Sequence, residues 1–250
     1  MGTMLTYLIT NKYIIYIIIL GLWQVAENSY LPGPFSLLAA GYEVYQYRVF
    51  WEHFFATMSR LFVSVAIAVT CSLIIGILVG YFSKLKEIVM PIIMFFFPIP
   101  KIVLLPIFFI WFGFGEVTRI IIISLVIFYP SVIYIYSYIQ KIPKVYIEVA
   151  RVCGAKNFKI IKSIVLPYIL PPVVSSLRTS FSLGMIGTVV TEIFNIQRGL
   201  GFFVEEAANS FNFDHAFVGV FTYGFIGLLI NYAITLAERH CFKWQDSVET

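Results

Sequence analysis

Charged residues are scarce in this chain. Asp, Glu, Lys and Arg make up only 12% of its 250 residues, whereas 60% are hydrophobic. A soluble domain is about one quarter charged and about half apolar. So few polar side chains cannot cover the surface toward water, and we therefore expect lipid to be the solvent. The net charge of +4 is modest and its basic residues lie between apolar runs, which argues against nucleic acid as a partner.

Motifs for catalysis and metal binding are also missing from the sequence. The three cysteines are scattered without a CxxC pair, so neither a disulfide framework nor a zinc site is expected. The three histidines lie far apart, and no HExxH, GxSxG or Walker-type phosphate loop occurs. We therefore predict no catalytic residue, no metal and no bound cofactor. An enzyme acting within the membrane is disfavoured for the same reason.

Long apolar runs are what the sequence has in abundance. A helix that crosses a bilayer needs about 20 apolar residues. The apolar run over 88–112 holds four prolines, so we expect a kink or a locally unwound segment there. The stretch Tyr42–Phe55 mixes aromatic and charged residues and predicts a helix lying at the membrane surface. We expect an all-α membrane protein, a single domain over 1–250, with six transmembrane helices at about 13–25 (beginning as early as Leu5), 57–82, 88–112, 117–139, 169–194 and 217–236.

Basic residues gather on one side of these spans. Lys and Arg are enriched in the short cytoplasmic loops of membrane proteins. If the N-terminus is cytoplasmic, eleven basic residues lie inside and four lie outside or at outer span ends. We therefore predict a multi-pass protein with both termini in the cytoplasm. The inner set is Lys12, Lys84, Lys86, Lys141, Lys144, Arg151, Lys156, Lys159, Lys162, Arg239 and Lys243, and the outer set is Arg48, Arg60, Arg119 and Arg198.

The longest connection on this inner side covers residues 140–167. Pro143 is suited to open a helix and Gly154 to end it, and a second, basic helix is expected over Asn157–Val165. The spacing i, i+4, i+7 predicts an apolar stripe on the first helix. The sequence thus predicts an elbow of two helices whose stripe can dock into the groove of a partner. The stripe is Val145, Val149 and Val152.

This connection resembles the cytoplasmic loop of bacterial and archaeal ABC importer permeases. Their signature is E-A-A, three residues, G, nine residues, then I-x-L-P. An ordinary basic linker would explain the lysines but not this spacing, and only Val149 departs from the usual alanine. The resemblance implies a coupling helix on which Glu148 is a polar contact to the ATPase and Ala150 a small docking residue. The matching positions are Glu148, Val149, Ala150, Gly154, Ile164, Leu166 and Pro167.

Further segments are similar to the branch of that family that handles sulfonates, taurine and nitrate. They are Leu31–Pro34, Pro98–Pro106, Trp111–Glu116, Leu177–Arg178, Gly199–Gly201, Glu238–Arg239 and Trp244. The resemblance implies a type I importer fold in a prokaryotic inner membrane. It also implies a homodimer of permeases, two cytoplasmic ATPase subunits that bind ATP and Mg²⁺, and an external substrate-binding protein.

The function implied is a permease subunit of an ATP-driven importer for a small solute, such as a sulfonate, taurine or nitrate. Systems for thiamine precursors share the pattern, so the substrate stays open. The alternative is an ion-coupled secondary transporter. Against it, the sequence shows no second copy of the proline-rich span and no clear acid in the middle of a span.

Candidate pathway residues lie in the third and fifth spans. Lys101 is ionisable and sits among prolines, so it either faces the pathway and attracts an anion or pairs with a carbonyl or carboxylate at a helix break. Arg178 is near enough to a span end to have a structural role. Small residues on one face of the fifth span predict either close helix packing, with the second copy among the options, or a hydrophilic path. That face holds Ser176, Ser180, Gly184, Gly187 and Thr191.

Overall fold

The structure, a computed structural model, describes residues 12–194 and 198–241, and within them the regular elements are helices. Four helices are long and apolar enough to cross a membrane, because each is an apolar run with few charges. They confirm the second, fourth, fifth and sixth predicted spans. They are α4 (Arg48–Tyr81), α7 (Glu116–Gln140), α10 (Leu166–Ile193) with the short helices that lead into it, and α12 (Phe213–Cys241).

The third predicted span is broken, as its prolines indicate. It consists of α5 (Ser83–Phe96), the 3₁₀ turn η1 (Lys101–Leu104) and α6 (Leu105–Phe112), and its two halves meet at 81°. Pro98 and Pro100 lack the backbone N–H that would continue α5, so the helix ends before them. If both halves cross together, this pair is a fifth span.

The first predicted span is the shorter helix α2 (Lys12–Val25), and an earlier start near Leu5 lies outside the described residues. The surface helix predicted over Tyr42–Phe55 is wrong. Helix α3 (Pro34–Val44) ends within that stretch, and α4 begins at Arg48. Without a proline or glycine before Gly76, α4 runs for 34 residues, or about 51 Å.

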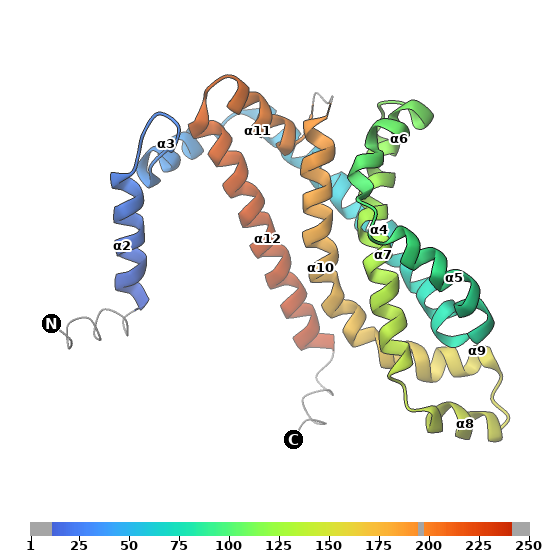
Figure 1. The fold of residues 1–250 in the computed structure, drawn as a ribbon. Helices are drawn as coiled ribbons and strands as arrows, with labels where there is room; N and C mark the ends of the chain where they lie inside the picture. Colours follow the sequence, from blue (N-terminus) through green and yellow to red (C-terminus); the bar gives the residue numbers. More distant parts are fainter. Residues whose placement is uncertain (1–11, 195–197, 242–250) are drawn as a thin grey trace.

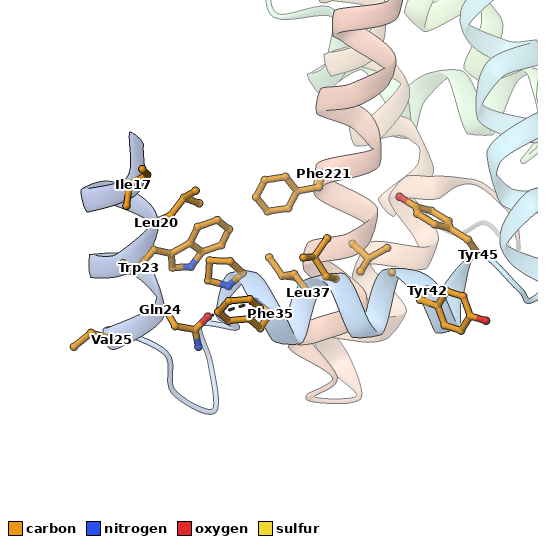
Figure 2. A pocket seen from close by; sticks show the side chains of 15 residues that line it. Ile17, Leu20, Trp23, Gln24, Val25, Phe35, Leu37, Tyr42, Tyr45 and Phe221 are labelled. Atoms are coloured by element: carbon orange, nitrogen blue, oxygen red, sulfur yellow. Dashed lines mark hydrogen bonds between the residues drawn. The ribbon is translucent and has the colours of Figure 1, made fainter. Parts of the chain in front are cut away.

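Helix α2 stands apart from the other spans and is joined to them through α3 (Figure 1). Figure 2 shows the apolar groove of about 850 Å³ that remains between α2, α3 and α12. Trp23 of α2 stacks on Phe221 of α12 with ring centroids 5.8 Å apart, and its indole N–H donates to the Pro32 carbonyl at 3.0 Å. These contacts hold α2 against the rest of the chain at one end only.

Helices α4 and α7 form the most extensive helix pair. A Cβ added to Gly76 would lie 2.8 Å from Ile135, and one added to Gly80 would lie 2.7 Å from Ile139. Only glycine permits so close an approach of the two backbones. The spacing of the two glycines therefore serves helix packing.

The two ends of the bundle carry different short helices (Figure 1). One end holds α8 (Lys144–Val152) and α9 (Asn157–Ile160), and we call it the α8 end. A π turn, η2 (Ile161–Val165), joins α9 to α10 without a break in the helix. The opposite end holds α11 (Leu200–Asn209), and we call it the α11 end. Helix α2 begins and α12 ends on the α8 side of the bundle.

Candidate functional site

Helix α8 is an exposed helix with an apolar stripe. None of its residues is buried, and Val145, Val149 and Val152 are 60%, 57% and 89% exposed. Val149, Ala150, Ile164 and Pro167 line an open groove of about 690 Å³ between α8 and the start of α10, together with Val145, Tyr146, Ser163 and Tyr168. An uncovered apolar surface of this kind marks a site of interaction.

The elbow that carries α8 has defined turns. Pro143 is the residue that precedes its first turn, as predicted. At its other end the N–H of Gly154 donates to the Arg151 carbonyl and the N–H of Ala155 to the Ala150 carbonyl, both at 2.9 Å. These two bonds form a Schellman motif, and Gly154 has the positive φ of 78° that this motif requires. A side chain at this position would be strained, which explains the glycine.

Buried side chains anchor the elbow to the spans. Ile142 before α8 packs with Ile139 of α7 and with Val165 and Ile169 at the start of α10, and Ile147 of α8 adds to this cluster. The predicted coupling residues take different positions in this elbow. Val149, Ala150, Ile164 and Pro167 face the groove, Gly154 forms the turn, Glu148 is exposed and Leu166 is half-buried.

Lys101 lies at the break of the third span. It is buried, and its Nζ donates to the carbonyls of Phe96 and Phe97 at the end of α5 and lies 4.3 Å from the ring centroid of Tyr129. Carbonyls in the last turn of a helix have no partner within that helix. The lysine supplies one, which is the geometry of the structural alternative. A contact with solute remains a prediction.

The small residues of α10 face α4 and α7 of the same chain. A Cβ on Gly184 would lie 2.8 Å from Leu61 and 3.2 Å from Ile127, while one on Gly187 would make ordinary contact with Ile123 at 3.6 Å. Thr191 is buried as well. These glycines therefore bring α10 close to helices of its own chain, which is the geometry of the close-packing alternative. A second copy or a hydrophilic path on this face stays a prediction.

Two serines complete that stripe. The hydroxyl of Ser180 lies 3.4 Å from that of Ser131 on α7, and Ser176 donates to the Val173 carbonyl one turn earlier. Both bonds are internal to the chain, so no member of the stripe is left to line open space except the partly buried Ser176. Its role in a pathway stays a prediction.

Arg178, about halfway along α10, has the structural contacts that we expected. Its Nη2 forms an ion pair with Glu238 of α12 and donates to Thr235 at 3.1 Å. Ser175 donates to the same carboxylate at 2.7 Å. The pair is partly exposed and fastens α10 to α12.

A buried polar cluster at the α11 end did not follow from the sequence reasoning. Its centre is Glu192 at the end of α10, which is fully buried. The Glu192 carboxylate accepts hydrogen bonds from Thr57 at 2.8 Å, from Tyr223 at 3.0 Å and from the backbone N–H of Gly201 at 2.9 Å. It also forms an ion pair with Arg60 at 2.6 Å. Four donors satisfy a charge that burial alone would make very costly.

Arg60 connects this carboxylate to α7. Its Nε and Nη2 donate to the two oxygens of Glu116 at 2.5 and 2.7 Å, a bidentate pair, and its Nη1 also donates to the Arg198 carbonyl at 2.8 Å. Arg119 lies one turn beyond Glu116, 3.8 Å from its carboxylate. The planar guanidinium has five donors, which suits it to join two carboxylates in this way.

The sequence did contain a signal for part of this cluster. His53, Thr57, Arg60 and Ser64 lie at i, i+4, i+7 and i+11, and together they form one polar stripe on an otherwise apolar helix. All four are buried. From the sequence we expect Arg60 at an outer span end and no acid in the middle of a span. Glu192 is a buried acid in the last turn of α10, not in the middle of that span, and its charge is paired with Arg60.

Comparisons with known proteins agree with these features. Residues 68–243 match the family described as "Binding-protein-dependent transport system inner membrane component". The taurine transport system permease protein TauC of Escherichia coli (strain K12) is 27% identical over 231 residues, which cover 90% of this chain and 84% of the relative. The putative aliphatic sulfonates transport permease protein SsuC of Bacillus subtilis (strain 168) is 27% identical over 238 residues, 93% of this chain and 86% of the relative.

A third relative is named for transport of a different class of solute. The formylaminopyrimidine transport permease protein ThiX of Halalkalibacterium halodurans is 22% identical over 245 residues, which cover 96% of this chain and 98% of the relative. The family match spans well over half of the chain. It includes three of the four long apolar helices in whole (α7, α10 and α12), α4 from residue 68 onward, and the elbow that carries α8. The chain is thus a multi-pass membrane permease that belongs to the family of inner-membrane components of binding-protein-dependent transport systems.

Proposed function

We propose that this chain pairs with a second copy to form the translocation pathway of an ATP-driven importer. Cytoplasmic ATPase subunits, which bind ATP and Mg²⁺, drive the pair, and an external binding protein delivers the solute. This chain itself is then the transport subunit and hydrolyses no ATP. Membership of the family supports each of these partners.

One observation carries the coupling role: an exposed apolar helix is fixed rigidly to the spans at one end of the bundle. A flexible loop could not transmit a displacement, whereas α8 is bounded by Pro143 and a Schellman turn and anchored through Ile142. Its stripe and the adjoining groove suit a partner that receives a short helix in a cleft. We assign this surface to the ATPase.

The orientation follows from the same loop. Six of the basic residues assigned to the inner side lie between Lys141 and Lys162. Because positive charge favours the cytoplasmic side, the α8 end faces the ATPase and the α11 end faces outward. Both termini then lie in the cytoplasm, since α2 begins and α12 ends on the α8 side.

The solute is a small anion such as a sulfonate, taurine or nitrate. Two relatives whose names refer to taurine and aliphatic sulfonates, each aligned over most of both chains, support this class. The relative named for formylaminopyrimidine favours a thiamine-precursor-like solute as the second candidate. Uptake of radiolabelled taurine and of formylaminopyrimidine by cells that carry the complete transporter distinguishes the two classes.

Replacement of Gly154 tests the coupling role. The Gly154→Val variant places a side chain at φ 78°, which costs about 1 kcal/mol or more and should misplace α8. We expect the ATPase to dissociate and uptake to cease, with membrane insertion intact. Co-purification of the ATPase with the permease measures this directly.

Gly113 provides a matched control. It has φ 77° and, like Gly154, no atom within 4 Å of an added Cβ, but it lies in the turn between α6 and α7, away from the α8 end. The Gly113→Val variant carries the same backbone strain and should keep its ATPase. Equal loss of the ATPase from both variants, or from neither, contradicts the assignment of α8.

A further inference from the structure

The start of α11 is held by side chains of two other helices. The N–H groups of three consecutive residues, Gly199, Leu200 and Gly201, donate to His53 Nδ1 at 3.0 Å, Thr57 Oγ1 at 2.8 Å and Glu192 at 2.9 Å. The first N–H groups of a helix have no partner within it. Here α4 and α10 supply these partners, and each bond joins α11 to a membrane-spanning helix.

Charge strengthens this attachment. The positive end of the α11 dipole faces the Glu192 carboxylate, which is favourable for an anion. Arg60 balances that carboxylate and is itself bound to Glu116. A continuous series of opposite charges therefore runs from α7 through α4 and α10 to the first turn of α11.

The start of α11 also lies too close to the end of α10 for a side chain to fit at either of two glycines. A Cβ on Gly199 would lie 2.4 Å from the carboxyl carbon of Glu192, and the residue has φ 143°. A Cβ on Gly201 would lie 2.9 Å from the Val189 carbonyl oxygen. Backbone and carboxylate thus touch directly, so α11 has little freedom to shift while these bonds persist.

We infer that Thr57, Arg60 and Glu192 are positioning residues that fix α11 onto the spans. We call this set of contacts the α11 clamp, with His53 as its fourth member. The inference deepens the proposed function, on which the outward orientation of α11 rests. In that orientation, the clamp fixes α11 at the outer end of the bundle, the end to which the external binding protein delivers the solute.

Thr57 allows the sharpest test. Its hydroxyl donates to Glu192 and accepts from Leu200, so Thr57→Val removes two bonds at almost constant volume, whereas Thr57→Ser keeps the hydroxyl. We expect amide hydrogen exchange of the α11 peptide, in the full-length chain in lipid nanodiscs, to accelerate about fivefold in Thr57→Val. Exchange in Thr57→Ser should match the wild type.

Glu192→Gln gives the stronger perturbation. Bonds to a charged group are the strong ones, so exchange of the α11 peptide should accelerate about 10- to 100-fold. Glu238→Gln is the matched control, because it breaks an Arg–Glu pair that joins α10 to α12 at Arg178, 14 residues or about 21 Å along the helix from Glu192. A peptide over Ile122–Ile127, which lies in the core, reports global unfolding.

The outcomes separate the clamp from general stability. The inference is supported if Thr57→Val and Glu192→Gln accelerate exchange in the α11 peptide alone. Exchange of that peptide in Thr57→Ser and in Glu238→Gln should then equal that of the wild type. Equal acceleration in the core peptide, or in Glu238→Gln, overturns it, as does wild-type exchange in Thr57→Val. The ATPase should remain bound to every clamp variant, so a failure of the coupling role of α8 would be seen in Gly154→Val and not here.

Transport adds a functional measurement. In cells that carry the complete transporter, uptake of radiolabelled taurine should fall in Thr57→Val and recover in Thr57→Ser. Undiminished uptake in a variant whose α11 peptide exchanges faster overturns the positioning role. If the wild type takes up no taurine, the substrate proposal is wrong and hydrogen exchange alone decides on the clamp.

Discussion

Gly184 offers a quantitative test of how α10 packs. A Cβ at this position would lie 2.8 Å from Leu61 Cδ1, 3.2 Å from Ile127 Cδ1 and 3.4 Å from Val65 Cγ2. All three neighbours are buried. Replacement of Gly184 with leucine therefore inserts four carbon atoms where even the first overlaps a neighbour.

The magnitude follows from two opposing effects. Overpacking of a filled core costs about 1–3 kcal/mol, and a whole leucine side chain belongs at the upper end of that range. Leucine recovers most of the helix propensity that glycine lacks, which is about 0.8–1 kcal/mol relative to alanine. We expect Gly184→Leu to lower the free energy of unfolding by about 2 kcal/mol, a change of about 30-fold in the folding equilibrium. Gly184→Ala should be close to neutral, since its smaller overlap is with the flexible end of Leu61.

A compensating change identifies the partner. Leu61→Ala alone leaves a cavity and should cost about 2–5 kcal/mol. In the Gly184→Leu background the new side chain can occupy that cavity. The double variant should therefore lose less stability than the sum of the single variants, by about 0.5–3 kcal/mol.

Unfolding in mixed micelles with increasing SDS measures these differences, and chemical crosslinking of the same samples reports pairing of two copies. Gly224→Leu is the control, because an added Cβ there meets no atom within 4 Å. Strict additivity of Gly184→Leu and Leu61→Ala would refute the packing described here. Wild-type stability of Gly184→Leu with loss of pairing would instead place this face of α10 against the second copy.

Two further predictions concern topology and the broken span. A cysteine at Lys156, in a variant without the native cysteines, should react with a membrane-impermeant maleimide only after permeabilisation, and labelling of intact cells would reverse the orientation. Lys101→Met removes the lysine donor from both carbonyls, of which Phe96 keeps a bond from the Ile99 N–H. It should cost about 1–3 kcal/mol of stability, measured by thermal unfolding in detergent, with unchanged uptake per folded molecule. Loss of uptake in Lys101→Met but not in Lys101→Arg would instead indicate a pathway role.

The spans and the elbow could be predicted because local properties determine them. The length of an apolar run and the position of prolines set α4, α7 and the break between α5 and α6. The turn at Gly154 depends on a φ that glycine adopts without strain, so the residue type alone indicates it. None of these predictions depends on which other helix packs against the segment.

The α11 clamp depends on contacts that the sequence pattern does not report. Thr57 and Leu200 are 143 residues apart, and periodicity identifies a polar stripe without naming its partner. The small stripe on α10 was ambiguous for the same reason, since a face of small residues packs equally well on its own chain or on another. The surface helix was wrong because the aromatic residues were read as a membrane-interface pattern, whereas Phe50 is buried in contact with Phe203 of α11.

The continuous helix that runs through α9, η2 and α10 is a bent lever with two arms of unequal length. Its short arm α9 lies across the base of the bundle and its long arm α10 rises to Glu192 (Figure 1). The π turn and Pro167, Pro171 and Pro172 occupy the corner, where helices bend most readily. The long arm has 28 residues and is therefore about 42 Å long. A rotation of about 5° at the corner would displace its far end by about 4 Å. The nine residues of α9 and η2 form an arm of about 14 Å, whose end the same rotation would displace by only about 1 Å. A small movement on one side of the membrane would then be enlarged about threefold on the other.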